Sequence, residues 1–214
     1  MTSTHLLLAA ALAAGASTPA APLLDLIRKA YTSAPSVQVQ FVQSYAPAGF
    51  SDTDPETGKL VLQAPSSLRF QYDGPEGKVF TFDGKAARQY VAVDKQMVVK
   101  PLTAAERARL PLLFLEEPRD LLARFDASAV VVDKGLTELT LTPKKGDEPK
   151  MATLRVDERG EVKRLVILDA SGNRTTFTFT GKEAGRTKRP ASDFELSPPR
   201  GTKILQGELT GEKP

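Results

Sequence analysis

The chain has 214 residues, a formal net charge of +3 at pH 7, 41% hydrophobic residues and 26% charged residues. This length and composition are typical of one sizeable soluble globular domain, or of two small ones at most. The sequence has no cysteine and a single histidine, His5. Disulfides, thiolate zinc sites and cysteine nucleophiles are excluded, and so are catalytic triads and His-ligated metals once the segment around His5 is removed.

The N-terminus predicts a targeting segment. Residues 6–16, LLLAAALAAGA, form an apolar run of signal-peptide length that is too short for the roughly 20 apolar residues of a transmembrane helix. Cleavage contexts of small residues lie at 14–16 and at 18–20. The first five residues contain no Lys or Arg, so a buried N-terminal helix or a misassigned start codon is the alternative. We expect residues 1–20 to be a signal peptide and the mature chain to be periplasmic.

A helix and a run of short strands follow. Leu23, Leu24, Ile27 and Tyr31 share one face at helical spacing, which predicts an amphipathic helix. Apolar residues then alternate with polar ones over residues 36–44, as in a half-buried strand. Short alternating segments separated by Gly, Pro and Asp continue to Pro101 and predict an antiparallel meander. Its further strands are expected at 58–64, 68–72, 78–82, 88–93 and 96–100.

The pattern changes at residues 101–125, which are rich in Ala, Leu, Glu and Arg. Thr103 followed by Glu106 predicts a capping box at a helix N-terminus. Pro111 and Pro118 divide the region into short helices, because proline fits best in the first turn of a new one. Strands are then expected at 129–132, 137–142, 151–156, 162–169 and 174–180, with a last one at 202–206.

These elements predict a mainly β fold with short helices. About eleven antiparallel strands form one domain over residues 21–207, followed by a polar tail at 208–214. A sheet of this size curls, and helices with an apolar face pack on its concave side. Sheet and helices together then enclose an apolar pocket, as barrels of comparable strand number do.

Four motifs carry a resemblance to a known family. They are GKLVLQAP at 58–65 followed by LRFQY at 68–72, Asp83-Gly84-Lys85 followed by Tyr90, LTLTP at 139–143, and FELSPPRG at 194–201. In their order and spacing, the residues from about 23 to 206 resemble the LolA family, the periplasmic carriers of outer-membrane lipoproteins.

The resemblance implies an unclosed antiparallel β-barrel with an α-helical lid over an apolar cavity that takes lipoprotein acyl chains. It also implies an inner-membrane ABC-type lipoprotein-releasing complex as donor, an outer-membrane receptor as acceptor, a monomeric carrier and no cofactor, metal or enzymatic activity. Each CH₂ group of such cargo costs about 0.8 kcal/mol in water, so a carrier must hide it. The alternative is an envelope lipid-binding or lipid-sensing regulatory module of the same half-barrel fold.

The candidate site residues fall into two sets, and ordinary core packing is the alternative for both. The expected cavity wall consists of Val37, Val39, Phe41, Leu60, Leu62, Leu68, Phe70 and Tyr72. The expected lid face consists of Leu110, Leu112, Leu113, Phe114 and Leu115.

The chain departs from the family at one position. Family members often carry an Arg immediately before the proline after the second strand, where it tethers the lid, but this chain has Ala64 there. Arg69 is the candidate substitute for this lid latch, or else an exposed strand charge.

Two other function classes are disfavoured. The carboxylate pair Glu116-Glu117 has no recognisable partner for two-carboxylate hydrolysis. Positive and negative charges are too evenly balanced for nucleic-acid binding, with 29 basic and 26 acidic residues.

Overall fold

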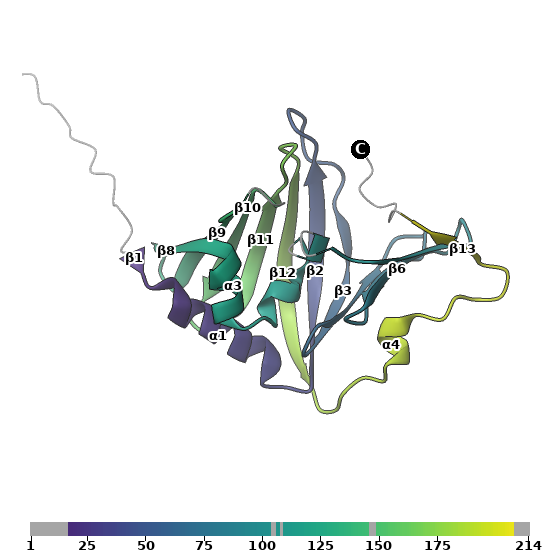
Figure 1. The fold of residues 1–214 in the computed structure, drawn as a ribbon, viewed down its shortest axis with the longest axis horizontal. Coiled ribbons are helices and arrows are strands. Elements are labelled where there is room, and N and C mark those ends of the chain that lie inside the picture. The colour runs from purple at the N-terminus through teal and green to yellow at the C-terminus, as the bar shows by residue number, and fades with distance from the viewer. Residues whose placement is uncertain (1–16, 104–105, 108, 146–148, 208–214) are drawn as a thin grey trace, which may run out of the picture.

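The computed structural model describes residues 17–103, 106–107, 109–145 and 149–207, and it shows one curved, open sheet (Figure 1). The thirteen strands of the described residues follow the order β1-β8-β9-β10-β11-β12-β2-β3-β4-β5-β6-β7-β13. They are β1 (Ser17–Thr18), β2 (Ser36–Ala46), β3 (Glu56–Gln63), β4 (Ser67–Tyr72), β5 (Lys78–Phe82), β6 (Ala86–Val91), β7 (Gln96–Pro101), β8 (Phe125–Asp133), β9 (Leu136–Pro143), β10 (Met151–Asp157), β11 (Val162–Leu168), β12 (Arg174–Gly185) and β13 (Lys203–Gln206). The helices with described bounds are α1 (Ala20–Thr32), the 3₁₀ helix η1 (Pro111–Phe114), α3 (Pro118–Arg124) and α4 (Ser192–Glu195).

The sheet consists of two meanders joined by one long-range pairing. Strands β2 to β7 pair in sequence, as do β8 to β12, and β12 pairs antiparallel with β2. The edge strands are β1, which pairs antiparallel with β8, and β13, which pairs parallel with β7. Because these two edges do not meet, the barrel is unclosed. The predicted mainly β, open antiparallel fold is confirmed.

Some boundaries differ from the predicted ones. About eleven strands were expected, and the described residues form thirteen. Strand β8 begins at Phe125, four residues early, because α3 ends at Arg124 and leads directly into it. Strand β12 continues to Gly185 beyond a register shift after Thr180, because the eleven-residue β2 offers it further partners. Residues 17–20, expected in the signal peptide, include β1 and the start of α1. Residues 1–16 and the expected tail at 208–214 lie outside the described residues.

Helices α1, η1 and α3 lie on the concave face, where the core lies. Helix α1 and helix α3 cross one face of the sheet, whereas α4 lies near the opposite end and contacts β4 and β5 (Figure 1). Helix α1 buries Leu23, Leu24, Ile27 and Tyr31, as its apolar spacing predicted. These side chains join one hydrophobic cluster with the inner faces of the strands and with η1. Helix α1 therefore packs beside η1 and α3, and η1 itself contacts the sheet through Phe114 and Phe179.

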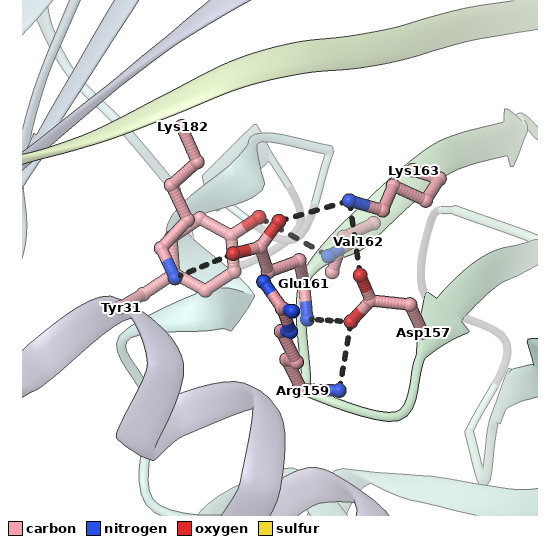
Figure 2. A network of polar contacts seen from close by, with 7 residues as sticks. All are labelled: Tyr31, Asp157, Arg159, Glu161, Val162, Lys163 and Lys182. Atoms are coloured by element: carbon pink, nitrogen blue, oxygen red, sulfur yellow. Dashed lines mark hydrogen bonds and ion pairs between the residues drawn. The ribbon is translucent and has the colours of Figure 1, made fainter. Parts of the chain in front are cut away.

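A polar network fixes the end of α1 to the β10–β11 turn (Figure 2). The backbone N–H of Val162 donates to the Tyr31 hydroxyl at 3.2 Å. Glu161 pairs with Lys163 at 2.8 Å and with Lys182 at 3.3 Å. Hydrogen bonding from Lys163, with the charges of both lysines, holds the pKa of Glu161 below its usual range and outweighs the opposing effect of burial. Both carboxylate oxygens of Glu161 are thus engaged, which orders the turn beside α1.

The turn itself is stabilised by Asp157. One oxygen of its carboxylate accepts hydrogen bonds at 2.9 Å from the backbone N–H groups of Arg159 and Glu161. The other oxygen pairs with Lys163 at 3.0 Å. Burial alone would raise the pKa of Asp157, but these hydrogen bonds outweigh it and lower that pKa. The network places Gly160, with φ +79°, directly against the backbone of Leu26 in α1.

Candidate functional site

An apolar cavity of about 220 Å³ opens between the two meanders and the segment that follows β7. Its apolar lining comes from β4, β5, β11 and β12 on the sheet side and from Leu102 and Leu110 on the other. The apolar lining residues are Phe70, Phe80, Leu102, Leu110, Ile167 and Phe177. The polar ones are Gln43, Tyr72, Lys78, Gln89, Glu106, Arg109, Asp169, Asn173 and Thr175.

Aromatic rings form the inner wall of this cavity. The ring centroids of Phe70 and Phe177 lie 5.7 Å apart, and Phe70 meets Phe41 edge-on at 5.2 Å. Phe177 stacks on Phe179 at 5.9 Å, and Phe179 meets Phe114 of η1 edge-on at 5.8 Å. These separations lie in the range of favourable aromatic pairs. The cavity wall is therefore continuous with the core beneath the short helices.

The eight predicted wall residues divide into two groups. Phe70 and Tyr72 line the cavity. The other six are buried in the core cluster and do not line the cavity as it stands; they are Val37, Val39, Phe41, Leu60, Leu62 and Leu68. Contact between these six and a ligand stays a prediction that requires the covering helices to move.

The five predicted lid residues lie over this same core. Leu110 lines the cavity, whereas Leu112, Leu113, Phe114 and Leu115 are at least 95% buried. Three of them lie in a 3₁₀ helix and not in an α-helix as expected. The reason is Pro118, which donates no backbone hydrogen bond and forces the helix after Pro111 to end within one turn.

Thr103 and Glu106 form the predicted capping box. The Thr103 hydroxyl accepts a hydrogen bond from the Glu106 backbone N–H at 3.2 Å, and the Glu106 carboxylate accepts one from the Thr103 backbone N–H at 2.8 Å. Glu106 also pairs with Lys100 of β7. Burial opposes these bonds but does not cancel them, so the pKa of Glu106 is lowered. Glu106 is thereby held in place where it lines the cavity.

Polar contacts also order the mouth on the sheet side. The Tyr72 hydroxyl donates to Gln43 Oε1 at 2.7 Å, and the Lys78 ammonium lies 3.9 Å from the centroid of the Tyr72 ring. Lys78 in turn pairs with Glu56. Burial, with a smaller effect from Glu56, raises the pKa of Tyr72 above its ordinary value. Burial likewise raises the pKa of Tyr31.

We expect Tyr31 and Tyr72 to ionise only when the protein unfolds. A folded-state pKa above the unfolded value of about 10 contributes stability that is complete below pH 10 and is lost as the pH rises further. The chain has four tyrosines. In an ultraviolet absorbance titration followed in parallel by circular dichroism, the tyrosinate absorbance of two of them should rise only together with the loss of structure. Tyr72→Phe should remove one of these late steps. Ionisation of all four near pH 10 without loss of structure would contradict the burial argument.

Arg69 does not contact the lid among the described residues. It donates to the Asp193 backbone oxygen in α4 at 2.9 Å and to Gln71 Oε1 at 2.9 Å. These bonds join β4 to the C-terminal segment on the face opposite the cavity. The lid-latch role of Arg69 therefore has no contact to support it here.

The lid is joined to α1 by a different arginine. Arg28 pairs at 2.5 Å with Glu117, the N-cap of α3. Both residues line a second cavity of about 460 Å³ that Ala64 also borders. The space beside Ala64, where the resemblance led us to expect an arginine, is thus bordered by Arg28 from α1.

Twelve of the fifteen lining residues were missed by sequence reasoning, among them Phe80, Gln89, Ile167 and Phe177. The alternation TTFTF at 175–179 marks Phe177 as inward-facing and could have identified it. Phe80 and Ile167 lie in predicted strands, but nothing local shows that the cavity reaches them. Gln89 carries no such signal, because a glutamine in a strand is more often taken as solvent-facing.

An open curled sheet with helices over an apolar cavity on its concave face defines the structural class. The family model described as outer membrane lipoprotein carrier protein LolA matches residues 32–196. The chain therefore belongs to the LolA family.

Individual relatives agree with this assignment. The chain is 27% identical over 187 residues to an outer-membrane lipoprotein carrier protein of Pseudomonas syringae pv. syringae, covering 87% of each chain. It is 29% identical over 170 residues to one of Xanthomonas oryzae pv. oryzae, covering 78% of this chain and 79% of the relative. An uncharacterized conserved protein from Thermus thermophilus shares the fold with a TM-score of 0.53 at 14% identity, over 88% of this chain and 99% of that one.

Two further observations concern the described residues alone. None of their helices is long and apolar enough to cross a membrane. No three His, Cys, Asp or Glu side chains among them come together in a way that would hold a metal ion.

Proposed function

We propose that this protein carries outer-membrane lipoproteins through the periplasm by enclosing their acyl chains, and that it is not an enzyme. The observation that supports this most is the aromatic-walled cavity in a member of the LolA family. Every CH₂ group that moves from water into the cavity contributes about 0.8 kcal/mol. A carrier needs a large, adaptable apolar surface and no catalytic group, which suits a wall of Phe, Leu and Ile.

Cargo binding requires the lid to move. At about 220 Å³ the cavity is smaller than the roughly 300–1,000 Å³ of pockets that bury a drug-sized ligand. The covering helices have four and seven residues, and helices this short depend on tertiary packing for their stability. Acyl chains and the lid side chains compete for the same inner surface, including Val39, Phe41 and Leu60. This competition lowers the affinity for the cargo, which allows the cargo to be released to the next acceptor.

We place the mature carrier domain at residues 17–207. The segment before Ser17 has the apolar core and the Ala14-Gly15-Ala16 context of a signal peptide. Cleavage after Ala16 leaves β1 intact to pair with β8, whereas cleavage after Ala20 would remove it. The mass of the mature protein from periplasmic extract distinguishes the two sites.

Family membership also supports a proposal about the partners. The donor is an inner-membrane ABC-type lipoprotein-releasing complex and the acceptor is an outer-membrane receptor, with a monomeric carrier between them.

The function is tested by comparing one cargo with and without its lipid. We expect purified carrier to form a one-to-one complex with an acylated lipoprotein and none with the same protein lacking its acyl chains, as measured by size-exclusion chromatography and native mass spectrometry. Equal binding of both forms would contradict the acyl-cavity mechanism. A free lipid bound in place of lipoprotein, in protein purified from periplasm, would favour the alternative of a lipid-sensing module.

A further inference from the structure

One polar side chain interrupts an otherwise apolar row across the concave face. The register aligns Val39, Leu60, Phe70, Phe80, Gln89 and Val98 on consecutive strands from β2 to β7. Residues directly opposite each other in a sheet point to the same side. Gln89 therefore faces the same way as Phe70 and Phe80, and all three line the cavity.

Gln89 is the mostly buried polar side chain of this row. Its exposed fraction is only 7%, and no hydrogen bond joins its side chain to a described residue. Among the described lining residues that are more than nine-tenths buried, the other polar one is Asp169, which accepts two hydrogen bonds from Asn173 at 2.9 and 2.8 Å. The amide atoms of Gln89 stay accessible to the cavity. A ligand that fills the cavity displaces water from this amide and leaves it unpaired unless the ligand bonds to it, and an unpaired buried amide costs free energy. Since methionine or leucine would complete the apolar row at no such cost, the amide favours a ligand that carries a hydrogen-bonding group.

We propose that the Gln89 side-chain amide recognises the carbonyl group of the cargo's acyl chains, donating an N–H hydrogen bond to the carbonyl oxygen. This inference rests on the proposed carrier function and adds a specificity determinant to it. An acyl chain differs from a plain alkyl chain by this carbonyl, which joins the chain to its headgroup.

The position of Gln89 fits this role. It lies on the same wall as the aromatic rings that would hold the hydrocarbon, and the cavity has a polar mouth where Gln43, Tyr72 and Lys78 are already engaged with one another or with Glu56. The chain's hydrocarbon would pack on Phe70, Phe80 and Phe177. The carbonyl would then meet Gln89, and the headgroup would point to the mouth. The carbonyl replaces the water that the bound chain displaces from the Gln89 amide, so cargo with the acyl linkage gains affinity that an ether-linked analogue lacks.

The test is a two-by-two comparison of protein and ligand. The probes are a diacylglycerol and the dialkylglycerol ether of the same chain length, and their dissociation constants are measured by displacement of a hydrophobic dye. Wild-type protein should bind the ester about two- to tenfold more tightly than the ether, as expected for one added hydrogen bond. Gln89→Met keeps the side-chain volume and removes the amide, so this preference should disappear while the ether binds at least as well as before.

A matched variant controls for nonspecific effects. Gln40→Met changes the same residue type on the outer face of β2, between the inward-facing Val39 and Phe41, and should keep the ester preference. Gln89→Met should also melt at the same temperature as wild type or higher, since it places an apolar side chain of similar size at a mostly buried position. Equal binding of ester and ether by wild type, or an ester preference that survives in Gln89→Met, would overturn the inference while leaving the carrier function intact. Failure of wild type to bind either probe would instead count against the carrier function itself.

Discussion

Replacing Phe114 with alanine is expected to lower the free energy of unfolding by about 3–5 kcal/mol, the usual cost of truncating a fully buried phenylalanine. Phe114 is 0% exposed, and its ring lies 4.9 Å from that of Tyr31 and 5.8 Å from that of Phe179. It thus connects η1 both to α1 and to β12. For a domain of this size each kcal/mol corresponds to about 2–4 °C, so the melting temperature should fall by roughly 6–20 °C.

The same substitution should loosen the lid. Without the Phe114 ring, η1 loses its aromatic contact with Phe179 of the sheet, and a hydrophobic dye should bind the empty variant more strongly than it binds wild type. Phe50→Ala is the matched control, because Phe50 is 76% exposed and the identical truncation there should change neither melting temperature nor dye binding. If Phe114→Ala behaves like Phe50→Ala in both measurements, then η1 is not a lid held by Phe114.

Local sequence signals predicted most of the helices and strands and the capping box at Thr103 and Glu106. The alternation in β2 identified Val37, Val39 and Phe41 as inward-facing, and all three are buried. The Thr103–Glu106 pair identified a helix N-terminus that the hydrogen bonds show. These signals succeed because the spacing of apolar residues and the capping of a helix both depend on residues that are close together in the chain.

What the sequence did not show depends on long-range contacts. Alternation assigns a residue to a face of the sheet but does not say how deep the covering helices lie over it. It therefore could not separate Phe70, which lines the cavity, from Leu60, which is sealed in the core. The partner of Arg69 lies 124 residues away in α4, and no local pattern indicates that contact. The cavity likewise depends on the pairing of β12 with β2, which brings the ring of Phe177 within 5.7 Å of the ring of Phe70, centroid to centroid.

The position of the lid depends on α1, and α1 depends on one glycine. Gly160 lies in the β10–β11 turn, and a Cβ atom there would lie 2.4 Å from the backbone oxygen of Leu26. Real Cβ atoms do not approach a carbonyl oxygen so closely, so α1 or the turn must shift. The turn is held by the Asp157 and Glu161 contacts shown in Figure 2, and α1 is joined to α3 through Arg28 and Glu117. A shift of α1 is therefore passed on to the lid.

We expect Gly160→Ala to lower the free energy of unfolding by roughly 2–5 kcal/mol, combining the cost of a left-handed backbone at a non-glycine residue with that of overpacking. Gly201→Ala separates the two terms, because Gly201 has nearly the same φ, +82° against +79°, and a Cβ there would meet nothing within 4 Å. Denaturant unfolding should show a loss of about 1–2 kcal/mol for Gly201→Ala and a clearly larger one for Gly160→Ala. Dye binding to the empty protein should rise in Gly160→Ala alone. Equal losses in the two variants would mean that α1 yields to the added methyl group without cost, and that the contact between Gly160 and Leu26 does not hold the lid in place.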